Sequence, residues 1–153
     1  EPVATFSPCF GGPFLTLHPF KYAELLKEKM LKFNSKVYLV NTGWVGGTPS
    51  SGAKRISIKD TRAIISSILN GSINNAHFEI DSIFGIGIPT KLDGVDSSVL
   101  FPRDAWLDKS GYDQNAKQLA ELFIENFSKY DDLKSSLKEF GPNLKERINE
   151  RAF

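Results

Sequence analysis

The residues best suited to chemistry lie in a glycine-rich stretch that follows a short apolar run. Residues Gly47 to Lys54 approach the phosphate-binding pattern G-x-x-x-x-G-K-[ST], in which backbone N–H groups cradle phosphates. The match is incomplete, because Ala53 separates the last glycine from Lys54 and Arg55 stands where a magnesium-binding hydroxyl residue is needed. The stretch therefore either binds an anion or is a mobile surface loop ahead of a capped helix, and spacing alone leaves both open.

Three side chains in and after this stretch suit a nucleotide. Arg55 can bind a polyphosphate through its bidentate guanidinium, and Thr61, one turn into the expected helix, can add a hydroxyl group. Solvent exposure without any ligand is an equally ordinary explanation for such residues. Trp44 is either a stacking platform for a flat ring or an anchor that holds the loop down.

The sequence offers little for metal or covalent chemistry. Its histidines, His18 and His77, have no acidic partner at ligand spacing, so we expect packing or capping roles and no metal site. The single cysteine, Cys9, excludes an internal disulfide framework and suits the reducing cytoplasm. A small buried hydrophobe explains it better than a nucleophile does. Turn and cap roles are expected for Asp93, Asp96, Asp104 and Asp108.

Composition bounds the fold and the partners. The chain has 153 residues, of which 41% are hydrophobic and 24% charged, and this suits one globular domain. The net charge of +1 gives no electrostatic motive for binding nucleic acid or a membrane surface. No apolar run reaches the roughly 18 residues needed to cross a bilayer. We therefore expect neither nucleic acid nor membrane among the partners.

Hydrophobic periodicity and turn residues predict a mixed α/β domain. Ser57 and Asp60 stand at capping-box spacing and mark a helix start, whereas Pro19 opens an earlier helix. The aromatic segment 1–18 is expected to pack against other parts of the chain. The predicted elements are helices over 19–34, 57–70, 112–129, 132–139 and 144–153, a buried strand over 37–40, a loop over 41–53, and one or two strands within 76–102 beside a turn at Asp93-Gly94.

Three blocks of sequence resemble one enzyme family. Residues 37–62 are VYLVNTGWVGGTPSSGAKRISIKDTR, which resembles the block VNTGW, a glycine loop and G-K-R-I-S-I-K-x-T-R of ATP-dependent phosphoenolpyruvate carboxykinases. The upstream FSPCFGGPFLTLHPFKYAELLKEKM and the downstream IFGIGIPTKLDGVDSSVLFPRDAW resemble further blocks of that family. The helix from Ala116 to Phe127 matches its late helix, so the resemblance covers roughly residues 1–130.

The resemblance implies an enzyme and a place within it. Family members are much longer, so residues 1–153 are expected to be a single partial domain, the C-terminal portion of the mixed α/β nucleotide-binding domain; the absence of an initiator methionine agrees. The family is a lyase of gluconeogenesis that converts oxaloacetate and ATP to phosphoenolpyruvate, CO₂ and ADP. It uses Mg²⁺ with ATP and a metal such as Mn²⁺ at the substrate. Its metal ligands and catalytic residues are expected upstream of Glu1, so this chain should hold neither and be inactive alone.

The resemblance also assigns nucleotide contacts. Arg55 matches the family arginine at the ATP phosphates, Ile56 lies beside the nucleotide, and Thr61 matches a threonine assigned to it. Residues 41–62 would flank the nucleotide, and residues 5–15 would belong to a mobile lid that excludes water. Two departures, Pro8 in the lid and Ala53 before Lys54, put the loop geometry in question.

Two other hypotheses remain. The chain could be a stand-alone, non-catalytic nucleotide- or anion-binding module with a degenerate P-loop. It could also be a structural core whose exposed apolar surface drives self-association.

Overall fold

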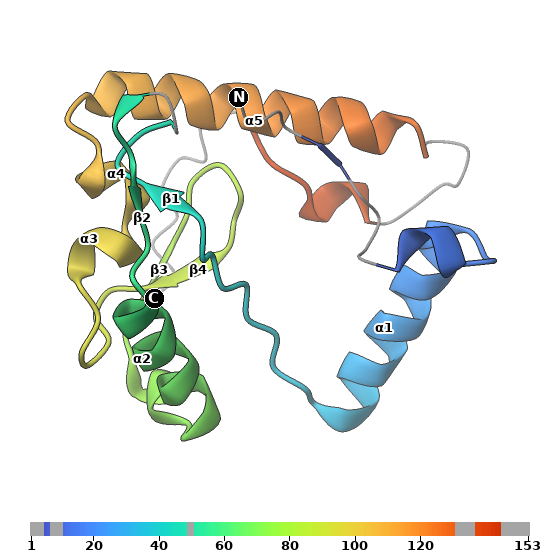
Figure 1. The fold of residues 1–153 in the computed structure, drawn as a ribbon. Coiled ribbons are helices and arrows are strands. Elements are labelled where there is room, and N and C mark those ends of the chain that lie inside the picture. Colours follow the sequence, from blue (N-terminus) through green and yellow to red (C-terminus); the bar gives the residue numbers. More distant parts are fainter. Residues whose placement is uncertain (1–4, 7–10, 49–50, 131–136, 145–153) are drawn as a thin grey trace, which may run out of the picture. The chain divides into compact units, whose positions relative to one another are not determined.

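The structure, a computed structural model, describes residues 5–6, 11–48, 51–130 and 137–144 (Figure 1). The chain divides into two compact units. The smaller unit is Pro2–Val40, and the larger one is Asn41–Phe153 together with Glu1. Each unit is built around its own helices, and the candidate site lies in the larger one.

The smaller unit contains the helix α1, Pro19–Phe33, which confirms the prediction for 19–34. Its ends follow the sequence signals. Proline occupies the first turn, the Nδ1 atom of His18 accepts a hydrogen bond from the Phe20 N–H at 3.3 Å, and Asn34 ends the helix with φ 48°. His18 is therefore a capping residue, as expected.

Apolar side chains of this unit are largely exposed. No residue of α1 is buried, and Phe14, in a 3₁₀ turn over Gly12–Phe14, is 87% exposed. The prediction that the aromatic N-terminal segment packs is therefore wrong for Phe14. Cys9 and Pro8 lie outside the described residues.

The predicted buried strand over 37–40 is wrong. The structure assigns no strand there, and the side chains of Val37 and Leu39 are 60% and 83% exposed. A β-strand needs a neighbour that accepts and donates its backbone hydrogen bonds, and neither sheet of the described residues includes this segment. The apolar run alone therefore does not make a strand.

Two antiparallel hairpins provide the β structure of the larger unit. In the first, β1 (Trp44–Val45) pairs with β2 (Lys54–Arg55), with Trp44 opposite Arg55. In the second, β3 (Phe78–Ile80) pairs with β4 (Gly87–Pro89), with Glu79 opposite Ile88. The second hairpin confirms the strands expected within 76–102. The predicted loop over 41–53 also contains β1, which pairs with β2 directly after it.

Helices make up most of the regular structure described in the larger unit. Helix α2 spans Ile58–Leu69, α3 Ser97–Leu100, α4 Pro102–Ala105 and α5 Lys109–Ser128, with 3₁₀ turns at Ser72–Asn75 and Lys138–Phe140. Helix α5 confirms the prediction for 112–129 and begins three residues earlier. The predicted helix over 132–139 lies outside the described residues as far as residue 136 and ends within the 3₁₀ turn Lys138–Phe140, and the one predicted over 144–153 lies outside them beyond residue 144. The α/β prediction thus becomes a mostly helical fold with two small sheets.

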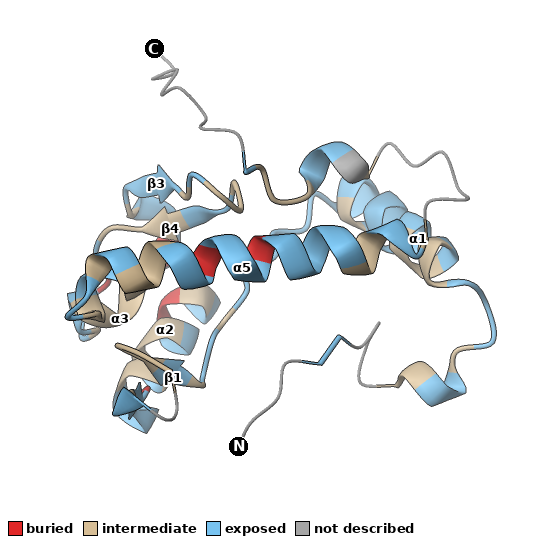
Figure 2. Ribbon diagram, turned by 90° about the horizontal axis from the view of Figure 1, so that it is seen from above, coloured by how far each residue is buried: buried red, intermediate tan, exposed pale blue. Residues whose placement is uncertain are grey.

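The core of the described residues is small. Its buried hydrophobic residues are Ile56, Ile73, Leu92, Ala116 and Ala120. The two alanines are four residues apart and so share one face of α5, the helix on which Figure 2 shows buried segments in red. In the described part of the chain, no helix is long and apolar enough to cross a membrane.

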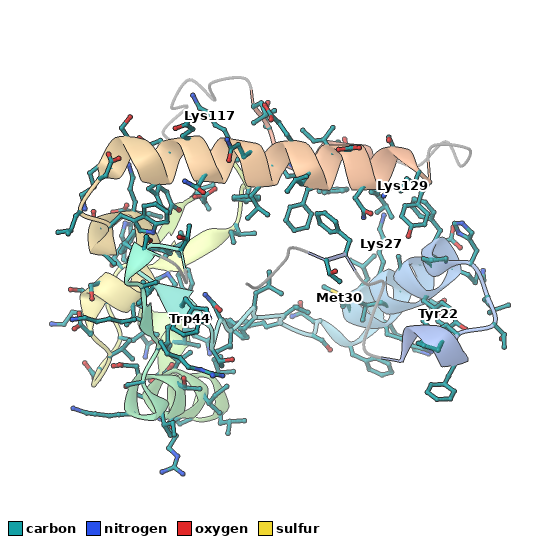
Figure 3. The ribbon with its side chains drawn as sticks, turned by 45° about the horizontal axis from the view of Figure 1, so that its top comes forward. Tyr22, Lys27, Met30, Trp44, Lys117 and Lys129 are labelled. Atoms are coloured by element: carbon teal, nitrogen blue, oxygen red, sulfur yellow. The ribbon has the colours of Figure 1, made fainter. Side chains whose placement is uncertain are left out.

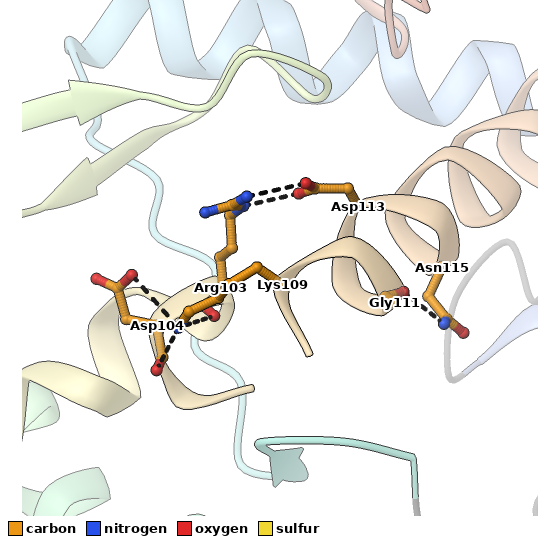
Figure 4. Close-up of polar contacts among 6 residues, drawn as sticks. All are labelled: Arg103, Asp104, Lys109, Gly111, Asp113 and Asn115. Atoms are coloured by element: carbon orange, nitrogen blue, oxygen red, sulfur yellow. Dashed lines mark hydrogen bonds and ion pairs between the residues drawn. The ribbon is translucent and has the colours of Figure 1, made fainter. Parts of the chain in front are cut away.

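A polar corner joins α4 to α5 (Figure 4). The Arg103 guanidinium donates to both carboxylate oxygens of Asp113, Nε to Oδ1 at 2.7 Å and an Nη to Oδ2 at 2.9 Å. The Lys109 Nζ donates to the carbonyl oxygens of Arg103 and Asp104, both at 2.8 Å, and so closes the end of α4. The hydrogen bond from Arg103 is the main cause that lowers the pKa of Asp113.

This corner predicts a pH-dependent effect of Asp113→Asn. Because the folded pKa of Asp113 is lowered, its contribution to stability is full above the ordinary carboxyl pKa of about 3.9 and is lost as the pH falls through the folded value. Urea unfolding should therefore show the variant less stable than wild type at pH 7, with the difference shrinking toward pH 3. Glu121→Gln, on the exposed surface of the same helix, is the control. A deficit that stays constant with pH would contradict the ion pair.

Candidate functional site

The three residues expected to contact a nucleotide lie at the junction of β2 and α2. Arg55 ends β2 and is exposed, and its guanidinium has no hydrogen bond or ion pair to any described residue. Ile56 follows and is only 8% exposed, with its backbone N–H donating to the Gly43 carbonyl oxygen at 2.9 Å. The buried Ile56 thus fixes the junction while Arg55 extends into solvent.

The start of α2 confirms the predicted capping box in a modified form. The Ser57 Oγ accepts from the Asp60 N–H at 3.0 Å and donates to the Asp60 Oδ2 at 2.6 Å. Thr61, partly exposed in the first turn, donates its backbone N–H to the Ser57 carbonyl oxygen at 3.0 Å. The cap therefore fixes the backbone that carries Thr61.

The described residues do not build a Walker-type phosphate cradle. In that motif the lysine opens the helix and the free N–H groups of the loop face the phosphates. Here Lys54 lies within β2, opposite Val45, and the Ser57 side chain occupies the Asp60 N–H. The Asp60 carboxylate also places a negative charge in the first turn of α2. This is the N-terminal end, where the helix dipole would otherwise attract an anion. The degenerate P-loop hypothesis therefore loses its geometric basis in this part of the chain.

The hairpin brings Trp44 next to Arg55, which spacing in the sequence did not predict. Residues directly opposite each other in an antiparallel pair project from the same face, so both side chains share one surface. Trp44 is 47% exposed, so part of its indole remains accessible (Figure 3). The signal that could have revealed this pair is the glycine-rich turn, read as a hairpin connection instead of an open loop.

The turn of the hairpin lies against α4. Gly46 has φ 86°, a left-handed conformation that favours glycine, and a Cβ at this position would lie 3.1 Å from the Ala105 carbonyl oxygen. On the other side of the turn, the Ser51 Oγ accepts from the Thr48 N–H at 2.7 Å. Helix α4 therefore supports the hairpin that carries Arg55.

The remaining candidates have structural roles. Among the described residues, no group of three or more His, Cys, Asp and Glu side chains could hold a metal ion. The His77 carbonyl oxygen accepts from the Thr90 N–H, and Asp96 caps α3, with its Oδ1 accepting from the Ser98 N–H at 2.9 Å. Asp93 lies in the predicted turn before Gly94, and Asp108 precedes α5 without a side-chain cap bond. The Oδ1 of Asp104 lies 3.9 Å from the Nζ of Lys109, within ion-pair distance.

Comparison with known proteins decides the family. The family profile for phosphoenolpyruvate carboxykinase matches residues 1–98. The chain belongs to the phosphoenolpyruvate carboxykinase family.

The related carboxykinases are similar well beyond this match. The chain is 50% identical over 146 residues to phosphoenolpyruvate carboxykinase (ATP) of Campylobacter jejuni subsp. jejuni strain 81-176, covering 94% of this chain and 28% of that protein. It is 53% identical over 146 residues to the Campylobacter lari protein of the same name, again covering 94% of this chain and 28% of the relative. The Agrobacterium fabrum carboxykinase is 46% identical over 145 residues, which cover 94% of this chain and 27% of the relative. The chain therefore spans little more than a quarter of the length of these carboxykinases.

The support of the hairpin by α4 predicts different effects for two glycine substitutions. Gly46→Ala and Gly52→Ala each place a Cβ at a positive φ, 86° and 84°, which costs about 1 kcal/mol. A Cβ at Gly52 meets nothing within 4 Å, whereas one at Gly46 meets the Ala105 carbonyl oxygen. Urea unfolding should show Gly46→Ala less stable than Gly52→Ala by about 1 kcal/mol or more. Equal losses would show that the turn does not lie against α4.

Proposed function

We propose that this chain is part of an ATP-dependent phosphoenolpyruvate carboxykinase, the lyase that converts oxaloacetate and ATP to phosphoenolpyruvate, CO₂ and ADP in gluconeogenesis. In this proposal residues 1–153 are the C-terminal portion of the nucleotide-binding domain, in the cytoplasm. Residues 41–62 contact the nucleotide, and residues 5–15 form part of a lid. The near-50% identity to enzymes of that name over almost the whole chain supports the activity. The observation that carries the nucleotide role is the exposed guanidinium of Arg55 beside a buried, hydrogen-bonded junction.

Arg55 is suited to polyphosphate by charge and by geometry. Its planar guanidinium can donate two parallel hydrogen bonds to phosphate oxygens, and these charge-assisted bonds are stronger than neutral ones. No described residue forms a hydrogen bond or an ion pair with the Arg55 guanidinium. Phosphoryl transfer depends mainly on positioning and on stabilising the charge of the transferred group, which a fixed arginine can supply. We assign Arg55 to the ATP phosphates on this basis.

Ile56 and Thr61 have different parts in the proposed site. Ile56 is almost completely buried, so it acts as a fixed wall beside the nucleotide and holds Arg55 through the Gly43 contact. Thr61 is partly exposed directly after Asp60 of the capping box, where its hydroxyl can donate to or accept from the nucleotide. Trp44 extends the same surface with an aromatic face.

The described residues do not fit the metal ions of the proposed reaction. Oxygen-rich or His-containing ligand groups are required for Mg²⁺ and Mn²⁺, and the described part of the chain brings no such group together. In the proposed enzyme these ions, and the oxaloacetate site, belong to residues outside this chain. No catalytic residue is assigned here.

Arg55→Ala in the complete enzyme tests the nucleotide role. Loss of a charge-assisted hydrogen bond of about 1.5–3 kcal/mol should lower kcat/KM for ATP by about 10- to 100-fold. Arg55→Lys, which keeps the charge but not the fork, should fall between Arg55→Ala and wild type. Lys117→Ala removes an equal charge from the exposed surface of α5 and serves as the control. Unchanged kinetics for Arg55→Ala would remove this residue from the site.

The isolated 153-residue chain is expected to form no phosphoenolpyruvate from oxaloacetate and ATP, because its described residues assemble no metal site. A coupled assay with Mg²⁺ and Mn²⁺ measures this, and turnover would overturn the proposal that the chain is only one part of the enzyme.

Calorimetry with ATP on the same chain tests the binding-module hypothesis. A specific complex that Lys54→Ala abolishes would favour that module.

A further inference from the structure

Asp60 has both carboxylate oxygens engaged at the start of α2. Its Oδ2 accepts from the Ser57 hydroxyl at 2.6 Å, and its Oδ1 accepts from the backbone N–H of Asp96 at 3.2 Å. The second bond joins residues 36 apart in the sequence. Asp60 is therefore both part of a helix cap and a link between two segments that are distant along the chain.

The second segment is a turn that lies against α2. A Cβ at Gly94, which has φ 76°, would meet the Cβ of Ala63 at an ordinary contact distance of 3.7 Å. Leu92, before the turn, is buried with 6% exposure. The turn ends where Asp96 caps α3 through the Ser98 N–H and hydroxyl. Asp60 thus ties the start of α2 to a segment held in place by a buried side chain and by its own cap.

Two hydrogen bonds hold the junction in place, one at Ile56 directly after Arg55 and one at Asp60 directly before Thr61. Before the helix, the Ile56 N–H is bonded to Gly43. After its first turn begins, Asp60 is bonded to the Asp96 N–H. Ser57 and its cap lie between them, and Thr61 directly follows Asp60. Both hydrogen bonds therefore fix the direction in which α2 leaves β2. They also fix the position of the Thr61 hydroxyl, which follows from that direction.

We infer that Asp60 is a positioning residue for the nucleotide, acting through the placement of Arg55 and Thr61 without contacting ATP itself. This inference rests on the proposed function. A carboxylate that acted through its charge would have the opposite effect, because it would repel a polyphosphate and weaken ATP binding. The two roles therefore predict changes of opposite sign when the side chain is removed.

The test compares Asp60→Ala and Asp60→Asn in the complete enzyme. Asp60→Ala removes both hydrogen bonds and should raise KM for ATP by about three- to tenfold, with KM for oxaloacetate unchanged. Asp60→Asn keeps an oxygen for the Asp96 N–H and an amide that can donate to Ser57, so it should restore KM to near the wild-type value. Asp60→Ser repeats the test with a second shortened side chain and should raise KM in the same direction.

Asp81→Ala is the matched control. It removes a carboxylate whose Oδ1 accepts from the N–H groups of Ile83 and Phe84 between β3 and β4, so it should lower stability without raising KM for ATP. Asp60→Ala combined with Thr61→Ala should raise KM by less than the product of the single effects, because both changes disturb one contact.

The outcomes separate the inference from the proposed function. If Arg55→Ala and Thr61→Ala leave kcat/KM for ATP unchanged, the nucleotide role of this junction fails. If they lower kcat/KM while Asp60→Ala changes only stability, or if Asp60→Ala and Asp60→Asn both lower KM for ATP, the positioning role of Asp60 is wrong and the nucleotide role stands.

Discussion

The hydrogen bond between the Ile56 N–H and the Gly43 carbonyl oxygen is the constraint on which the rest of the candidate site depends. It closes the base of the β1–β2 hairpin at 2.9 Å, directly before Ser57 begins α2. Because Ile56 is also buried, the chain cannot shift its register here without exposing an apolar side chain. Arg55 and Ser57, on either side of Ile56, are placed by the same bond. A strand, an exposed cation and a helix cap are thereby fixed within three residues.

Many large apolar side chains of the described residues are exposed. Large apolar side chains such as Leu39, Leu69 and Leu107 are 83%, 81% and 103% exposed, whereas the buried hydrophobic residues of the described part are few and mostly small. Contiguous exposed apolar surface usually marks an interface. The related carboxykinases are much longer than this chain, and a larger body could cover these side chains.

The elements predictable from sequence are those with a complete local signal. Pro19 and Asn34 bound α1, Ser57 and Asp60 begin α2, and Gly94 forms its turn, because each depends on neighbours within four residues. The apolar run at 37–40 was wrongly predicted as a strand because pairing depends on a distant partner. For the same reason the sequence did not predict the Trp44–Arg55 pair or the bond from Asp60 to Asp96. The sequence indicated the cap formed by Ser57 and Asp60. It did not indicate that the second carboxylate oxygen of Asp60 accepts from the Asp96 N–H.

The use of Asp60 in the cap has a consequence for how this family member can recognise phosphate. A helix N-terminus attracts anions through its free N–H groups, but here the Ser57 hydroxyl occupies one of them and a carboxylate lies in the first turn. The end of α2 is therefore neutralised from within the protein. In the proposed site the positive charge that this part of the chain offers a polyphosphate comes from Arg55, which is exposed and is followed by the buried Ile56. In the proposed site, the glycine-rich segment before Arg55 thus lies beside the nucleotide without forming a P-loop, because its Lys54 is part of β2.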